Sequence, residues 1–204
     1  MECILFTLIS KAYSKLLIQP LRSLSYVDEP IFTDDHENML CILLSSIFIL
    51  AFSFNANMYM KTLSVILFFC LVCISYTDTQ SGYIFDRFNV VILLVGIILI
   101  ASDFSFILLK DKLIGAMAGG GFLSFMNSLS IIVFKKEGIG GGDIKLCFAC
   151  GLVLGIDLMI VAFILSFIPA AIYTVFVCRK SSNDIALGPF LCVSIICSYC
   201  LGMS

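Results

Sequence analysis

The stretch KKEGIGGGDIKLC, residues 135–147, separates two long apolar runs of a chain that carries little charge elsewhere in its length. It combines two lysines, a run of three glycines and a single carboxylate, Asp143, which opens the next apolar run. Consecutive glycines weaken a helix and leave its backbone uncovered. The stretch therefore predicts a break between two apolar helices, and it raises the question of why an acid lies there.

Composition around this stretch indicates a membrane protein. Of the 204 residues, 61% are hydrophobic and 13% are charged, whereas soluble domains are about half apolar and a quarter charged. The charged residues cluster between apolar runs that are long enough to cross a bilayer core of about 30 Å. We therefore expect an all-α, polytopic membrane protein. The net charge of -2 and the lack of a basic stripe argue against a nucleic-acid partner.

The apolar runs predict a bundle of about seven transmembrane helices within a domain of residues 38–204. A turn at Gly155 and Asp157 is expected to divide the fifth span from the sixth. Residues 1–37 are expected to form a separate cytoplasmic segment, an amphipathic interfacial helix and an acidic loop rather than a signal peptide. The seven candidate spans are 39–57, 60–77, 88–104, 113–134, 143–156, 158–177 and 185–203.

The basic residues predict the orientation of these spans. With a cytoplasmic N-terminus, nine Lys and Arg residues lie inside and three outside, as the positive-inside rule favours. Asp78 ends the second span and Asp143 begins the fifth, so an even number of crossings separates them. Both acids are therefore expected at the cytoplasmic face of the inner (plasma) membrane, where they can be neighbours.

Each acid has a structural as well as a functional interpretation. Asp78 could be the polar end of a helix, and Asp143 could be an N-cap residue. Ionisable groups at membrane depth mark function by default, and uncovered backbone is tolerated there only beside a cavity or packed protein. The glycines next to Asp143 favour the functional interpretation of this acid, because an uncovered backbone beside a carboxylate allows an extended peptide to bind close to it.

Four segments resemble one known family, the type IV prepilin peptidases, which are intramembrane aspartic proteases. GIGGGDIKL (138–146) resembles their G-x-G-D motif with its following Ile-Lys-Leu, and DTQSGYIFDRFN (78–89) is similar to their first-aspartate segment. In the latter, Phe85 stands where the family has proline. LIGAMAGGGFL from Leu113 and ALGPFL from Ala186 resemble two further family segments.

The resemblance implies that Asp78 and Asp143 are the catalytic dyad and that Gly140 and Gly142 are the motif glycines. Lys145, two residues beyond the motif, is a candidate substrate-proximal residue, and the alternative is a lysine that only extends to the membrane interface. The implied substrate is the leader of a type IV pilin-like precursor (prepilin or pseudopilin), cut at the cytoplasmic face for a type IV pilus or for protein secretion. No cofactor and no metal are implied. The first 37 residues show no match to the paired C-x-x-C motifs of the methyltransferase region, so a short family form is expected.

Hydrolysis by two carboxylates needs one ionised to take a proton from water and one protonated to polarise the scissile carbonyl. We expect Asp143 to be the base, because a helix N-terminus favours the anion there. Asp78, at the C-terminal end of a helix, is expected to be the acid.

Two other function classes remain open from the sequence. The acids could bind protons or ions in a transporter subunit, although no convincing internal repeat supports this class, or the chain could be an inactive peptidase-like scaffold. The presenilin type of protease also uses G-x-G-D, but it typically has Tyr before its first aspartate, where this chain has Thr77.

The remaining ionisable and sulfur-containing residues are expected to be structural. Most of the ten cysteines lie in apolar runs, where thiols pack as small hydrophobes, so metal binding is not expected. His36 is interpreted as a solvated loop residue. Asp86 and Arg87 are interpreted as a loop pair, and Asp157 as a structural residue on the opposite face.

Overall fold

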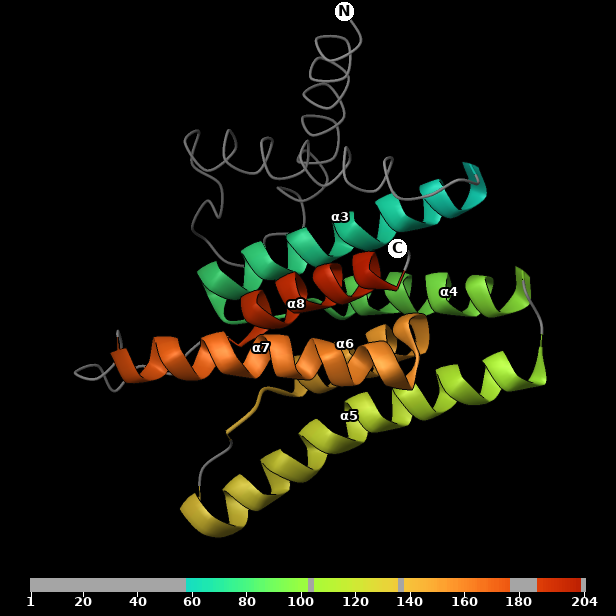
Figure 1. Cartoon of the computed structure of the whole chain (residues 1–204). Coiled ribbons are helices and arrows are strands. Elements are labelled where there is room, and N and C mark those ends of the chain that lie inside the picture. Colours follow the sequence, from blue (N-terminus) through green and yellow to red (C-terminus); the bar gives the residue numbers. More distant parts are fainter. Residues whose placement is uncertain (1–57, 103–104, 136–137, 177–186, 203–204) are drawn as a thin grey trace, which may run out of the picture. The chain divides into compact units, whose positions relative to one another are not determined.

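The computed structural model describes residues 58–102, 105–135, 138–176 and 187–202, and within these ranges every regular element is a helix (Figure 1). This confirms the predicted all-α class. The expected segment 1–37 and the first expected span, 39–57, lie outside the described residues. The helices of the described part are α3 (Met58–Ser81), α4 (Asp86–Ser102), α5 (Phe106–Phe134), α6 (Gly141–Leu154), α7 (Ile156–Phe176) and α8 (Gly188–Leu201).

These helices coincide with the second to seventh spans expected from the sequence, but they differ in length. Three stretches within them are long and apolar enough to cross a membrane: Met58–Thr79, Phe106–Val133 and Ile156–Thr174. The helix α8 is a shorter apolar helix, and α6 has only 14 residues. At 1.5 Å per residue α6 is about 20 Å long, less than the bilayer core. The described residues hold six helices, three of them long enough to cross a membrane, so the predicted count of about seven transmembrane helices is not confirmed.

The chain divides into two compact units, Met1–Val72 and Cys73–Ser204. The first unit is described from Met58 onward, where it forms the first part of α3. The second unit holds the last turns of α3 and all of α4 to α8. Asp78 and Asp143 both belong to this second unit, so the arrangement of the two acids is a property of one compact body.

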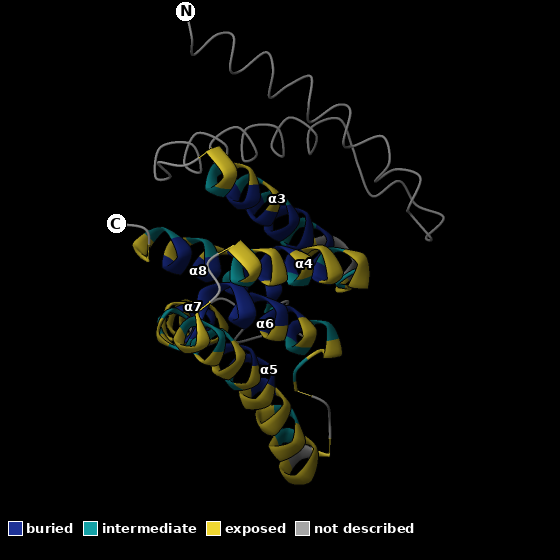
Figure 2. Ribbon diagram, turned by 90° about the vertical axis from the view of Figure 1, so that its right-hand side faces the viewer, coloured by how far each residue is buried: buried dark blue, intermediate teal, exposed yellow. Residues whose placement is uncertain are grey.

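Helix α6 is the core of the second unit. It contacts α4, α5, α7 and α8, and nearly all of its residues from Leu146 to Leu154 are buried, as Figure 2 shows. The contact with α5 is backbone on backbone: a Cβ on Gly151 would lie 2.3 Å from the carbonyl oxygen of Gly115, and a Cβ on Gly119 would lie 2.4 Å from that of Cys147. Small residues allow such close helix approach in membranes.

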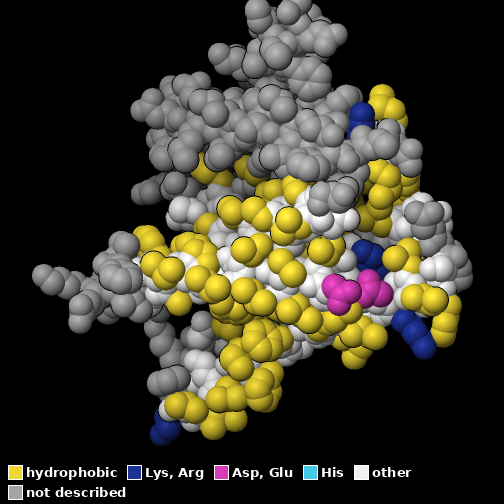
Figure 3. All heavy atoms as spheres, viewed as in Figure 1, with side chains coloured by type: hydrophobic (Ala, Val, Ile, Leu, Met, Phe, Trp, Pro, Cys, Tyr) yellow, Lys and Arg dark blue, Asp and Glu magenta, His cyan; other side chains and the backbone are white. Residues whose placement is uncertain are grey.

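The outer faces of the helices are apolar, as expected of a membrane protein. In α7 the exposed residues Ile160, Ile164, Ile168 and Ile172 recur every four positions, while Ser166 lies among the buried ones. Burial of apolar surface contributes about 25 cal/mol per Å², so a stripe of this kind is unfavourable in water and favourable against lipid. Hydrophobic side chains also cover most of the described part of the face shown in Figure 3.

The predicted turn between the fifth and sixth spans is confirmed, with a partner that the sequence analysis did not identify. Gly155 separates α6 from α7 with φ +84°, a conformation that favours glycine. The N–H of Ile156 donates to Oδ1 of Asp111 on α5 at 3.2 Å, and Nζ of Lys112 donates to the carbonyl of Val153 at 2.5 Å. Charged side chains of α5 therefore satisfy one free carbonyl where α6 ends and one free N–H where α7 begins.

Candidate active site

Asp78 lies in the last turn of α3 and is buried, with 6% of its surface exposed. Its Oδ2 accepts a hydrogen bond at 3.0 Å from the backbone N–H of Gly188, the first residue of α8. There is no room for a side chain between them, because a Cβ on Gly188 would lie 2.4 Å from Oδ2. The first N–H groups of a helix have no partner within the helix and favour a negative charge. Asp78 therefore lies at the C-terminal end of one helix and at the N-terminus of another.

Asp143 is the third residue of α6 and is 8% exposed. Gly140 is the N-cap residue of this helix, and its backbone amide interacts with the Asp143 carboxylate. The other oxygen, Oδ1, is buried without a hydrogen-bond partner. A buried polar atom without a partner is costly and often marks a place where a ligand or water binds.

The structure brings the two acids, which are far apart in the sequence, into one neighbourhood. They are close enough for the charge of Asp78 to act on the carboxyl group of Asp143. The buried thiol of Cys192, on α8, lies near both carboxylates. Three helices therefore form this neighbourhood: α3 carries Asp78, α6 carries Asp143, and α8 provides Gly188 and Cys192.

The position of α8 changes the expected roles of the acids. The sequence argument considered only the helix that carries each acid, and on that basis it made Asp143 the base and Asp78 the acid. Since Gly188 donates a hydrogen bond to Asp78, the N-terminus of α8 also favours the anion at Asp78. The position of each acid relative to the helix ends therefore no longer decides which carboxylate is the base and which is the acid.

The glycines before Asp143 have different environments. Gly142 is packed against the α3–α4 connection, where a Cβ would lie 2.8 Å from Cβ of Ile84. Gly140 is exposed, and a Cβ added there would lie 3.3 Å from Oδ2 of Asp143. A Cβ added to Gly141 would meet nothing within 4 Å. Close packing against Ile84 therefore explains Gly142, while the backbone at Gly140 and Gly141 stays accessible, as an approaching peptide requires.

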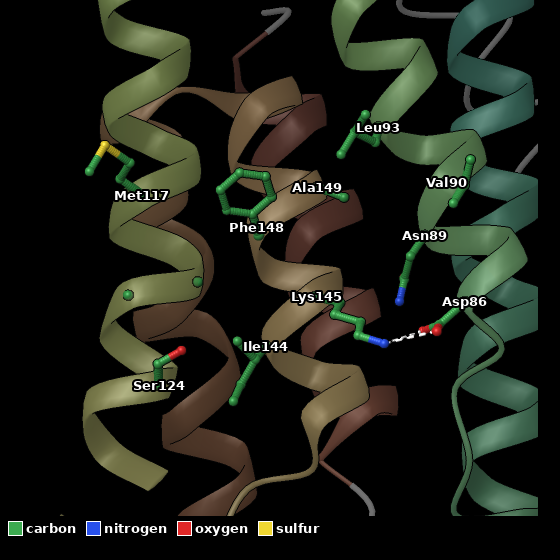
Figure 4. Close-up of a pocket in the computed structure, with 12 residues that line it drawn as sticks. Asp86, Asn89, Val90, Leu93, Met117, Ser124, Ile144, Lys145, Phe148 and Ala149 are labelled. Atoms are coloured by element: carbon green, nitrogen blue, oxygen red, sulfur yellow. Dashed lines mark hydrogen bonds and ion pairs between the residues drawn. The ribbon is translucent and has the colours of Figure 1, made fainter. Parts of the chain in front are cut away.

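Lys145 extends toward α4, where its Nζ forms an ion pair with Asp86, the first residue of that helix, at 2.9 Å from Oδ1 and 2.8 Å from Oδ2 (Figure 4). Residues two apart in a helix do not share a face, so Lys145 and Asp143 point in different directions. The sequence analysis paired Asp86 with Arg87, whereas the structure gives it Lys145 as its partner. Asp157 is exposed in the first turn of α7, just after the turn that ends α6, and thus at the other end of α6 from Asp143.

Sequence reasoning missed the role of two residues at this site. Gly188 and Cys192 were not assigned any function, although ALGPFL had been noted as a family-like segment. A Gly-Pro pair at the start of an apolar run is the available signal, because proline is favoured in the first turn of a helix. That signal locates a helix N-terminus, but it does not say that Asp78 lies against it.

The fold and the site together define a class: a helical membrane protein in which two buried carboxylates from different helices lie close enough to interact. Residues 65–175, more than half of the chain, match the type IV leader peptidase family. The chain belongs to this family. The matched residues include both Asp78 and Asp143.

Two characterised relatives are similar to the chain over part of their length. It is 28% identical over 124 residues to a prepilin leader peptidase/N-methyltransferase of Neisseria gonorrhoeae, covering 61% of this chain and 43% of that protein. It is 31% identical over 132 residues to a prepilin leader peptidase/N-methyltransferase of Escherichia coli (strain K12), covering 63% of this chain and 58% of that protein. The chain thus spans about half the length of these relatives. No solved structure matches it.

Gly188→Ala tests the contact between α8 and Asp78. The added Cβ would lie 2.4 Å from Oδ2 and 2.8 Å from Cγ of Asp78, so we expect the carboxyl group to be displaced while α8 keeps its helix. A displacement of about 1 Å can cost about 100-fold in rate. The measurement is the cleavage rate of a pilin-like precursor together with the thermal unfolding temperature in detergent. Val193→Ala, at an exposed position of the same helix, is the control, and a wild-type rate for Gly188→Ala would contradict the expectation.

Proposed function

We propose that the chain is an intramembrane aspartic endopeptidase that removes the leader of type IV pilin-like precursors. The observation that carries the proposal is the meeting of Asp78 and Asp143, two buried carboxylates from α3 and α6, in a member of the leader peptidase family. Both acids lie in the part of the chain that matches the family. The proposal concerns the peptidase reaction alone.

In the proposed mechanism the two carboxylates share one proton and titrate as a pair, since two close like charges resist simultaneous ionisation. Asp78 is the ionised partner, because Gly188 donates a hydrogen bond to it. Asp143 is the protonated partner, because its Oδ1 is buried without a hydrogen-bond donor. These roles reverse those expected from the sequence.

The reaction then follows general acid and base catalysis. Asp78 takes a proton from a water molecule as the water oxygen bonds to the carbonyl carbon of the scissile peptide. Asp143 donates a hydrogen bond to the carbonyl oxygen, where negative charge develops. The C–N bond breaks as Asp78 passes the proton that it took from water to the departing amine nitrogen, which returns Asp78 to its ionised form. Accessible backbone at Gly140 and Gly141 lies next to Asp143, where an extended substrate segment would bind.

The proposed substrate and location follow from the family and the charge distribution. The relatives' names describe prepilin leader peptidases, and for this chain we propose a precursor with a basic leader followed by an apolar helix, destined for a type IV pilus or for secretion. The proposed location is the inner membrane with the acids at the cytoplasmic face, which the excess of basic residues on that side supports.

The proposal is tested by producing the chain in a bacterial host that lacks its own leader peptidase, together with a panel of pilin-like precursors. We expect the wild type to make a single cut between the basic leader and the apolar helix, identified by mass spectrometry of the new N-terminus. The control is the double variant Asp78→Asn/Asp143→Asn. A wild type that cuts no precursor would favour the inactive scaffold, and equal processing by the double variant would exclude the two acids as the catalytic pair.

The orientation needs a separate measurement. Inverted membrane vesicles expose the cytoplasmic face, whereas spheroplasts expose the opposite face. A detergent-free precursor peptide added from outside is expected to be cut by inverted vesicles only. Cutting by spheroplasts alone would place the site on the other side of the membrane.

A further inference from the structure

The connection between α3 and α4 is short and begins at the turn that carries Asp78. The N–H of Gly82 donates to the carbonyl of Asp78 at 2.9 Å, and Gly82 has φ +65°, which closes the helix. Only residues 82–85 separate α3 from α4. Any shift of the first turn of α4 is therefore transmitted through a few residues to the turn that holds Asp78.

Two contacts join this connection to the first turn of α6. Ile84 lies directly on Gly142, the residue before Asp143, with no space for a side chain at the glycine. Asp86, at the start of α4, accepts hydrogen bonds from Lys145, two residues after Asp143, with both carboxylate oxygens. One contact therefore lies on each side of Asp143 in the sequence.

The polar surroundings of the ion pair add little to the link between α4 and α6. Beside it lies a pocket of about 620 Å³ between α4, α5 and α6, which Asp86 and Lys145 help to line (Figure 4). Asn89, one turn further along α4, is buried, yet neither atom of its amide has a hydrogen-bond partner. It adds no polar link between α4 and α6 at this end. At the start of the two helices, the polar link that the described residues show is thus the pair between Asp86 and Lys145, beside the apolar contact of Ile84 with Gly142.

We propose that Asp86 and Lys145 are positioning residues, whose ion pair holds the turn of Asp78 at the correct spacing from the turn of Asp143. The inference rests on the proposed catalytic pair. Neither charged group acts on the substrate in this proposal. Lys145 is 59% and Asp86 64% exposed, so the pair contributes little to stability. Its effect on the rate can still be large, because small misplacements of catalytic groups are costly.

The experiment measures kcat and KM of purified variants on one precursor. Asp86→Asn and Lys145→Gln are each expected to lower kcat about 10- to 100-fold with little change in KM. Their double variant should be no slower than either single variant, since both remove the same interaction. The exchange Asp86→Lys/Lys145→Asp should recover most of kcat, while Asp86→Lys alone should not, because it places two lysines together. Lys145→Arg, which keeps the pair, should remain close to wild type.

The controls separate this inference from a general loss of fold and from failure of the proposed function. Asp157→Asn removes an exposed acid just beyond the other end of α6 and should keep the wild-type kcat. Thermal unfolding in detergent should change little in all these variants. If Asp78→Asn and Asp143→Asn stay inactive while Asp86→Asn is fully active, the positioning role is wrong and the peptidase function stands. Loss of activity in Lys145→Gln without recovery in the exchange variant would instead give Lys145 a direct role at the substrate and overturn the inference.

Discussion

Asp78→Asn and Asp143→Asn are each expected to lower the rate of precursor cleavage on the order of 10³-fold, which lies within the usual contribution of a general acid or base. Asparagine has the size of aspartate but can neither take nor supply the proton that the pair shares. Oδ of the asparagine at position 78 can still accept the hydrogen bond from Gly188. The fold should therefore be preserved, and the loss should appear in kcat.

The double variant gives the sharper measurement. Catalytic residues that act as one unit show losses that are far from additive, so Asp78→Asn/Asp143→Asn should be about as inactive as either single variant. Asp157→Asn is the control for removing an acid from this membrane protein. Rates are measured with the purified protein on one precursor, and thermal unfolding is recorded for each variant. A single variant that retains more than about a tenth of the wild-type rate would contradict the catalytic assignment.

Gly151→Ala is expected to have the largest effect on stability. Helix propensity alone predicts a gain of about 1 kcal/mol for this change. The added Cβ, however, would lie 2.3 Å from the carbonyl oxygen of Gly115 and 2.8 Å from Cα of Ala116. Both are backbone atoms of α5, which cannot rotate away as a side chain can. Overpacking costs about 1–3 kcal/mol. The sign of the change in stability therefore shows whether α5 and α6 meet backbone to backbone.

The measurement for Gly151→Ala is the thermal unfolding temperature in detergent and the yield of monodisperse protein. The overpacking cost of about 1–3 kcal/mol, less the propensity gain of about 1 kcal/mol, leaves a net loss of up to about 2 kcal/mol. We therefore expect the unfolding temperature to fall by up to about 8 °C, given about 2–4 °C per kcal/mol for a chain of this size. Gly121→Ala is the matched control, because a Cβ at this position of α5 would meet nothing within 4 Å. It should be neutral or slightly stabilising. An increase in stability for Gly151→Ala would show that the two helices are further apart than the structure places them.

Much of the fold could be predicted from the sequence, because the relevant signals are local. Apolar runs bounded by charges located α3 to α8, and the Gly155 turn was visible as a break within one long run. The even number of spans between Asp78 and Asp143 was enough to predict that both acids face the same side. These properties depend on length, hydrophobicity and turn residues, which each segment carries by itself.

The partners within the site could not be predicted, because they depend on how the helices are rotated and paired. A helix that is apolar all round has no periodic pattern to show which face is inside. Nothing in ALGPFL says that Gly188 donates to Asp78, and nothing in DIKL says that Lys145 reaches Asp86 rather than the substrate. The assignment of acid and base changed for the same reason, since a second helix end, that of α8, lies against Asp78.

By itself, the sequence determined an all-helical chain suited to a membrane and the approximate positions of its helices, and it predicted two acids on a common side. Only the tertiary structure decided that the N-terminus of α8 lies against one acid, that Ile84 lies on Gly142, and that α5 and α6 meet through their glycines. The physical reason is that hydrophobicity places a segment in the membrane, whereas close packing and hydrogen bonds between segments select its neighbours.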